Sequence, residues 1–236
     1  MCSLPSGQVI VADFNNSRVK LLDKHYNVCC HCDVPGAPED ICLITSSEVA
    51  VTLDAAGVQF MSVSNRQLVN GRNVQLPHAA NGIAHHQGAL YITSRDALYH
   101  YTLTGTLVKK LYENRGHLTV LKCALSPAGD RIYVTNYYQN KLITLATDGT
   151  VISTFTDPEL QGSYVVHVTP SGQVLVLRSS SLIVIQVDHE GGKKLATVAS
   201  QTDIIGLCKP LSICYNTNTD QIIVGVGDNI MVMDLQ

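Results

Sequence analysis

The segment "VADFNNSRVKLLD", residues 11–23, contains two short apolar runs separated by a polar break. Apolar runs of this length are typical of β-strands, and Asn and Ser in the break favour a tight turn. The pattern therefore predicts a β-hairpin whose loop spans residues 13–18. A single hairpin is not stable on its own, so the fold depends on whether this unit recurs along the chain.

The apolar run that opens at Val9 does recur, at a nearly constant spacing. Its six copies start at Val9, Val49, Leu90, Ile132, Val174 and Ile222. Each copy follows a turn cluster rich in Gly, Pro, Asn or Ser and precedes a second apolar run, and most units add a third. Repeats of about 40 residues that contain several short strands are typical of β-propeller blades.

We therefore predict an all-β, six-bladed β-propeller. Each blade is expected to be a four-stranded antiparallel sheet, and the last blade is expected to lack its outer strand, because the sequence ends after its third apolar run. The chain, 1–236, is predicted to be one domain. Its blades are predicted to span about 1–35, 36–76, 77–116, 117–160, 161–205 and 206–236.

The composition agrees with a folded protein and limits the partners and the cellular location that we expect for it. Hydrophobic residues make up 45% of the 236 residues, and the net charge is −3, which argues against a protein that binds polyanions over its whole surface. No apolar run approaches the roughly 18 residues of a membrane span, and we see no signal peptide. Eight Cys are too few for a disulfide scaffold. We expect free thiols, a cytoplasmic location and no membrane association.

Three segments resemble the NHL repeat, which carries Asp, Asn and Arg in the loop between its second and third strands. These segments are "VADFNNSRVKLLD" (11–23), "CALSPAGDRIYVTN" (123–136) and "VTNYYQNKLITLATDG" (134–149). The chain as a whole is similar to the C-terminal propellers of tripartite-motif (TRIM) proteins. Residues 51–61 and 225–233 depart from the pattern. A WD-repeat propeller is disfavoured because the sequence contains no Trp.

This resemblance implies a recognition module rather than a catalyst. NHL propellers bind a protein or, in some members, RNA, while RING, B-box and coiled-coil domains supply ubiquitin-ligase activity and dimerisation. None of those domains is in this sequence. The expected role is therefore substrate recognition for a TRIM-like E3 ubiquitin ligase. The chain alone is expected not to be an enzyme, to need no cofactor and to oligomerise through upstream domains. We also expect it to be a fragment or a shortened product of a longer protein.

The expected partner site lies on the face where the loops between second and third strands emerge. Basic residues occur in or beside these loops in four blades, and the connection that carries Arg115 is expected to open on the same face. Aromatic residues lie there too. The predicted partner-binding residues are Phe14, Arg18, Arg95, Arg115, Tyr137, Tyr138, Lys141 and Arg178. A protein partner is preferred and RNA is the alternative. Acidic residues in the same loops keep an ordinary solvated surface open as a further alternative.

No catalytic and no metal-binding residues are predicted. Cys29-Cys30-His31-Cys32 contains a single C-x-x-C on a strand, whereas a structural zinc site needs four ligands. His167 replaces the small residue found at the same place in the other inner strands. A metal-dependent hydrolase or lyase, the third alternative, would need carboxylates or His residues that converge on the central channel. Glu39, Asp40 and Asp157 fit no metal motif.

Overall fold

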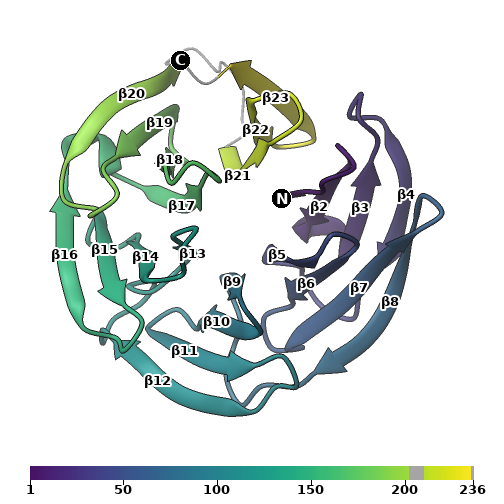
Figure 1. Ribbon diagram of the computed structural model, residues 1–236, viewed down its shortest axis with the longest axis horizontal. Coiled ribbons are helices and arrows are strands. Elements are labelled where there is room, and N and C mark those ends of the chain that lie inside the picture. The colour runs from purple at the N-terminus through teal and green to yellow at the C-terminus, as the bar shows by residue number, and fades with distance from the viewer. Residues whose placement is uncertain (202–209, 235–236) are drawn as a thin grey trace. The chain divides into compact units, whose positions relative to one another are not determined.

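The computed structural model describes residues 1–201 and 210–234 of the chain. In this part of the chain the strands form six antiparallel sheets of consecutive strands, five with four strands and one with three (Figure 1). The prediction of an all-β, six-bladed β-propeller is confirmed, as is the three-stranded last blade. No helix among the described residues is long and apolar enough to cross a membrane.

The first three blades alternate strands with short turns. Blade one contains β1 (Cys2–Ser3), β2 (Val9–Asp13), β3 (Arg18–Leu22) and β4 (Val28–Asp33). Blade two contains β5 (Asp40–Thr45), β6 (Glu48–Thr52), β7 (Val58–Ser64) and β8 (Gln67–Val74). Blade three contains β9 (Ile83–His86), β10 (Ala89–Thr93), β11 (Ala97–Thr102) and β12 (Leu107–Glu113).

The remaining blades follow the same order. Blade four contains β13 (Cys123–Leu125), β14 (Arg131–Asn136), β15 (Lys141–Ala146) and β16 (Val151–Thr156). Blade five contains β17 (Ser163–Val168), β18 (Val174–Arg178), β19 (Leu182–Val187) and β20 (Lys194–Gln201). Blade six contains β21 (Pro210–Asn216), β22 (Gln221–Val226) and β23 (Asn229–Asp234). Two 3-10 helices, η1 (Phe14–Asn16) and η2 (Pro158–Leu160), lie outside the sheets.

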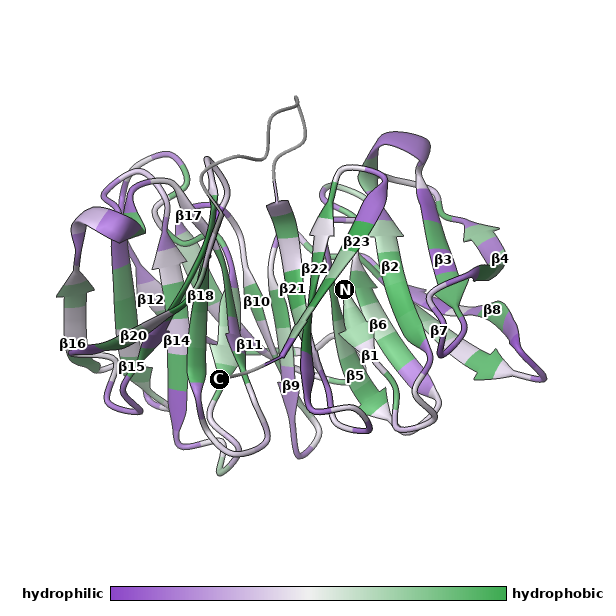
Figure 2. Ribbon diagram, turned by 90° about the horizontal axis from the view of Figure 1, so that it is seen from above, coloured by the Kyte–Doolittle hydropathy of each residue, from purple (hydrophilic) through white to green (hydrophobic). Residues whose placement is uncertain are grey.

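Burial differs between the strands of a blade. In blades two to six the second strand is the most buried, as in β14, where five of the six residues from Arg131 to Asn136 are buried. The outer strands alternate or are mostly exposed, as in β4 and β12. Figure 2 shows the corresponding apolar stretches along strands such as β2, β6 and β18. A strand with apolar side chains on both faces must be covered on both faces, which is the environment of a strand inside a stack of sheets.

The chain divides into two compact units. The first comprises Met1–Ser94, Leu98–Lys110 and Asn216–Thr219, and the second comprises the described residues of Arg95–Ala97, Leu111–Tyr215 and Asp220–Gln236. Each unit has its own apolar clusters, such as the one around Val51 in the first unit and the one around Val176 in the second. The single-domain organisation stays a prediction. The predicted boundary between blades five and six, near residue 205, lies outside the described residues.

The opening hairpin is more compact than the sequence predicts. Asp13 and Arg18 are not loop residues, because they are the last Cα pair of the ladder between β2 and β3. The loop proper is η1 followed by Ser17, which adopts a left-handed conformation with φ 51° and donates its N–H to the carbonyl of Phe14. A tight turn of this kind needs one residue at positive φ, and this requirement is not visible in the alternation of apolar and polar residues.

Candidate functional site: the loop surface of blades three to five

In the second unit, the loop of blade three contacts the segment that connects blades three and four. The N–H of Val120 donates to the carbonyl of Arg95 at 3.0 Å. The carbonyl of Leu118, in the same connection, accepts the N–H of Tyr137 at 3.1 Å. The connection is therefore hydrogen-bonded on one side to the blade-three loop and on the other to the blade-four loop.

The blade-four loop is joined to blade five in the same manner. The N–H of Gly162, in the connection between the two blades, donates to Oδ1 of Asn140 at 2.9 Å. The carbonyl of Gly162 accepts the N–H of Ser179 at 3.1 Å and its hydroxyl at 3.0 Å. These bonds make one continuous structure of loops and connections, which we call the loop surface. It comprises residues 95–96, 114–120, 136–141, 158–162 and 178–181.

Six of the eight predicted partner-binding residues lie on the loop surface: Arg95, Arg115, Tyr137, Tyr138, Lys141 and Arg178. The side chains of Arg95 and Arg115 are exposed, and Tyr138 is 73% exposed. The other two, Phe14 and Arg18, belong to the first unit. The structure thus gathers most of the predicted set on one surface, while their role in binding stays a prediction.

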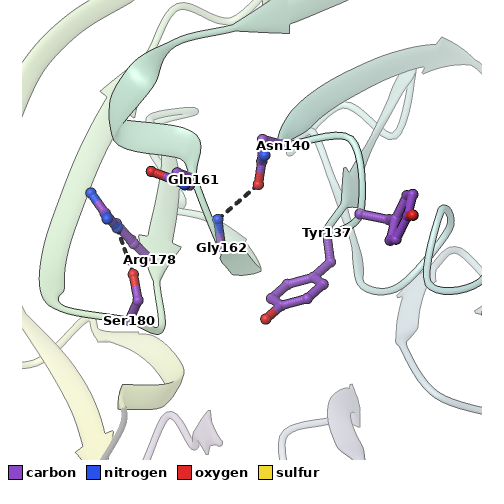
Figure 3. A pocket seen from close by; sticks show the side chains of 7 residues that line it. Tyr137, Asn140, Gln161, Gly162, Arg178 and Ser180 are labelled. Carbon is purple, nitrogen blue, oxygen red and sulfur yellow. Dashed lines mark hydrogen bonds between the residues drawn. The ribbon is translucent and has the colours of Figure 1, made fainter.

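A hollow of 390 Å³ lies on the loop surface where blades four and five meet (Figure 3). Its lining consists of Tyr137, Tyr138, Asn140, Gln161, Gly162, Arg178 and Ser180. Three of these were expected to bind a partner. The other four were missed because uncharged polar residues and glycine in a loop carry no distinctive signal. The only hint in the sequence is their position next to the predicted basic and aromatic residues.

Arg178 is held at the hollow by its own strand and by the following turn. It is the last residue of β18 and pairs with Ser163 of β17 and Ile183 of β19. Its Nε donates a hydrogen bond to Oγ of Ser180 at 2.7 Å, and Figure 3 shows the two side chains together on the side of the hollow opposite Tyr137. The guanidinium is therefore positioned by a polar neighbour and not neutralised by a carboxylate hydrogen bond.

The blade-four loop presents its two tyrosines differently. Oδ1 of Asn136 accepts the N–H of Gln139 at 2.9 Å, and Asn140 has a left-handed backbone with φ 53°, so the loop turns tightly. The ring of Tyr137 meets the ring of Tyr164 edge to face, with centroids 6.1 Å apart. Tyr137 is 36% exposed, whereas Tyr138 is 73% exposed. One tyrosine is thus fixed by an aromatic neighbour, and the other presents most of its ring to a partner.

Acidic groups near the hollow have partners of their own. The carboxylate of Glu159 interacts electrostatically with Arg178 but accepts its hydrogen bonds from Lys194 Nζ, at 2.5 Å, and Thr197 Oγ1, at 2.9 Å. The bond from Lys194 lowers the pKa of Glu159. The carboxylate of Asp157 accepts the N–H of Glu159 as the cap of η2. No acidic residue lines the hollow itself, so its polar lining is neutral or positive.

The blade-one loop, in the first unit, has a different charge arrangement. Arg18 Nε contacts Oδ1 of Asp33 at 2.7 Å, and Lys20 Nζ contacts Oδ2 of Asp13 at 2.6 Å. The side-chain amide of Asn16 donates to both oxygens of Asp13. The basic residues of this loop are therefore engaged in local ion pairs, and only Phe14, 52% exposed, offers a large apolar contact.

The alternative metal and redox sites find little support in the geometry. Cys29, Cys30 and Cys32 are free thiols on β4. Burial raises the pKa of the Cys32 thiol, which is the opposite of what a reactive cysteine requires. Within residues 1–201 and 210–234, no group of three or more His, Cys, Asp or Glu residues is placed to hold a metal ion.

His167 lies on the inner strand of blade five. It pairs with Leu175, and the corresponding positions in blades one to four are held by Cys2, Cys42, Ala84 and Ala124. Burial lowers the pKa of His167 to about 4, because a charged imidazole is poorly stabilised away from water. At pH 7 this side chain is therefore neutral.

Comparisons with known sequences identify no relative. No protein-family model matches the chain, and no curated protein matches it. The resemblance to NHL repeats and TRIM proteins thus stays a hypothesis.

Solved structures share the fold over nearly the whole chain. A protein of unknown function from Bacteroides caccae has a TM-score of 0.74 at 11% identity, with 96% of this chain and 89% of that chain covered. A streptogramin B lyase has a TM-score of 0.66 at 14% identity, with 100% and 82% covered. Virginiamycin B lyase from Staphylococcus aureus has a TM-score of 0.65 at 12% identity, with 99% and 83% covered. At such low identity the likeness shows the fold alone.

These neighbours correct one prediction. From the sequence we predict that this chain alone is not an enzyme, but two proteins with the same fold are lyases. The exclusion of catalysis is therefore wrong, since the β-propeller supports either a binding platform or an enzyme.

Proposed function

We propose that this β-propeller is a binding platform and that the loop surface is where a protein partner binds. The observation that carries the proposal is the hollow where blades four and five meet, which combines Arg178 with Tyr137 and Tyr138. Arginine and tyrosine are the side chains that most often anchor protein interfaces. The connections between blades hold the loop backbone by hydrogen bonds, so little conformational entropy is lost when a partner binds.

Affinity capture with paired variants tests this proposal. The purified chain, a Tyr138→Ala/Arg178→Ala variant and a Phe14→Ala/Arg18→Ala variant are immobilised, and proteins retained from cell extract are quantified by mass spectrometry. The blade-one variant is the matched control, because it also removes one aromatic and one basic residue from a blade loop. We expect a set of partners that the loop-surface variant loses and the control keeps. Equal retention by all three proteins would contradict the proposal.

A finer proposal concerns the protein in which the platform works. The resemblance of residues 11–23 and 134–149 to NHL repeats favours substrate recognition for a TRIM-like ubiquitin ligase in the cytoplasm. A captured partner should then become ubiquitylated when it is incubated with the full-length gene product, ubiquitin and the activating and conjugating enzymes. If no ubiquitin is transferred to the partner, the ligase role is excluded, whereas the proposal of a binding platform is unaffected.

The structural neighbours favour a second candidate, a lyase-type enzyme. His167, half-buried and neutral at pH 7, is the residue of the second unit that we would assign as a proton acceptor. The test is to incubate the chain with a streptogramin B compound and divalent cations and to follow its loss by mass spectrometry. Turnover that a chelator and His167→Ala both abolish would support an enzyme, and turnover that His167→Ala leaves intact would exclude this residue.

A further inference from the structure

We infer that the hollow binds the side-chain carboxylate of an acidic segment of a partner protein, with Arg178 as the counter-ion. This inference rests on the proposed function, because it specifies the partner chemistry for the same surface. Its first support is the balance of donors and acceptors around the hollow. The acceptors Gly162 O and Asn140 Oδ1 already receive hydrogen bonds from neighbouring groups.

In contrast, several hydrogen-bond donors of the lining remain available to a ligand. Nε of Arg178 is engaged by Ser180 Oγ, which leaves the two terminal nitrogens of the guanidinium. Ser180 accepts that bond and keeps its own hydroxyl hydrogen, and Asn140 keeps its amide hydrogens. Because Gly162 O and Asn140 Oδ1 are engaged while these donors remain available, the lining favours a ligand that accepts hydrogen bonds. With no acidic side chain among the seven lining residues, that ligand can be an anion.

A second support comes from a buried hydroxyl next to the hollow. Ser163 follows the lining residue Gly162, is 2% exposed, and its Oγ has no hydrogen-bond partner among the described residues. It pairs with Arg178 across β17 and β18, and directly opposed residues point their side chains to the same face of a sheet. A buried hydroxyl without a partner is unfavourable. A hydrogen-bond acceptor of a ligand, placed beside Arg178, would give the Ser163 hydroxyl a partner.

The geometry of Arg178 narrows the ligand to a planar acid. Because Nε is held by Ser180, the guanidinium offers its end, where the two terminal N–H groups lie parallel. A carboxylate meets this end with two parallel hydrogen bonds. The exposed ring of Tyr138 also lines the hollow and gives an apolar neighbour of the acidic residue a surface to pack against.

An acidic protein segment fits these observations better than RNA does. RNA binding requires several phosphate contacts and stacked bases. Arg178 is the single basic side chain among the seven lining residues, so the hollow offers too few charges for the successive phosphates of an RNA strand. The ring of Tyr137 is already packed against Tyr164, which leaves Tyr138 as the broadly exposed aromatic of the lining. One arginine among the uncharged residues of the lining suits a single carboxylate.

The test is a titration of the isotope-labelled chain followed by NMR, with acetyl-Glu-Leu-Glu-amide as the probe. Acetyl-Gln-Leu-Gln-amide serves as the neutral match and decauridine as the RNA probe. We expect the Glu peptide to shift the Gly162 amide and the Arg178 Nε–H signal saturably and to bind at least tenfold more tightly than the Gln peptide. Arg178→Gln should weaken binding at least tenfold, and Arg178→Lys should have a smaller effect because it keeps the charge but loses the planar fork.

Two further variants separate the hollow from general charge and from misfolding. Arg18→Gln removes the same charge from the blade-one loop and should change affinity by less than twofold. Ser163→Ala should weaken the Glu peptide by about two- to fivefold without lowering the melting temperature, because it removes a donor that has no partner in the free protein. Thermal unfolding of each variant verifies that the fold is retained.

The outcomes distinguish the inference from the proposed function. Equal affinity for the Glu and Gln peptides, or tighter binding of decauridine at the same signals, would overturn the inference. If captured partners nevertheless depend on Tyr138 and Arg178, the proposed function stands and the acidic chemistry alone is wrong. If the Glu peptide binds at the hollow but no captured partner depends on it, the proposed function is the part that fails.

Discussion

Blades one and five each carry an arginine at a strand end beside the loop between the second and third strands, and the two arginines have different partners. In blade one, Arg18 is the first residue of β3 and pairs with Asp33, and Lys20 pairs with Asp13. In blade five, Arg178 also stands at a strand end beside a loop, but its Nε bonds to Ser180 and its guanidinium lines a hollow.

The difference arises from the neighbouring strand and not from the loop. Asp33 is the last residue of β4 and is the Cα partner of Arg18 in the ladder between β3 and β4, so blade one supplies its own counter-ion. In blade five, the Cα partners of Arg178 are Ser163 and Ile183. The residues opposite Arg178 in the sheet are therefore neutral, whereas Arg18 lies opposite a carboxylate.

Of the proposed changes, truncation of Leu160, which precedes the lining residue Gln161, should affect stability most. Leu160 is fully buried, at 0% exposure, and anchors η2 in the apolar cluster between blades four and five. Leu160→Ala leaves a cavity and should lower the free energy of unfolding by about 2–5 kcal/mol. Chemical denaturation measures it. Leu195→Ala, at a position on β20 that is 55% exposed, is the control and should change stability by no more than about 0.5 kcal/mol.

The inner strands of blades one and five also differ, and this difference should make stability depend on pH. Blade one has Cys2 where blade five has His167, and burial lowers the pKa of His167 from 6.5 to about 4. The unfolded chain therefore takes up a proton that the folded chain resists as the pH falls from 6.5 to 4. Stability is full above this window and should fall through it by roughly 3 kcal/mol, with no further loss from this group below pH 4.

His167→Ala provides the check on that pH dependence. The variant should lose most of the fall in unfolding free energy between pH 6.5 and 4, measured by denaturation at several pH values. His85→Ala is the comparison, because burial also lowers the pKa of His85. An unchanged pH profile in His167→Ala would show that His167 is not the source of the dependence.

The smallest effect concerns the blade-one ion pair. Arg18 and Asp33 are 43% and 76% exposed at their side chains, and exposed pairs of this kind contribute about 0.2–1 kcal/mol. A double-mutant cycle with Arg18→Ala and Asp33→Ala should give a coupling energy in that range, and 1 M salt should abolish it. A coupling that survives high salt would mean that the pair is more strongly shielded from solvent than its exposure indicates.

Much of the fold is predictable from the sequence because it repeats. The apolar runs from Val9 to Ile222 determine both the blade number and the strand order, and turn residues mark where strands end. The site is only partly predictable. Tyr137, Tyr138 and Arg178 stand out by residue type, whereas Gln161 and Gly162 line the hollow only because a connection between blades packs beside a loop. The Arg18–Asp33 pair likewise depends on strand register, which the apolar pattern does not resolve.

The role of Arg178 in binding a carboxylate is decided by the affinity of acetyl-Glu-Leu-Glu-amide for Arg178→Gln and for Arg18→Gln, each relative to the unchanged chain. Both variants remove one arginine from a blade loop, so general electrostatic attraction affects them alike. We predict at least a tenfold loss of affinity for Arg178→Gln and less than a twofold change for Arg18→Gln. Equal losses in the two variants would contradict this prediction.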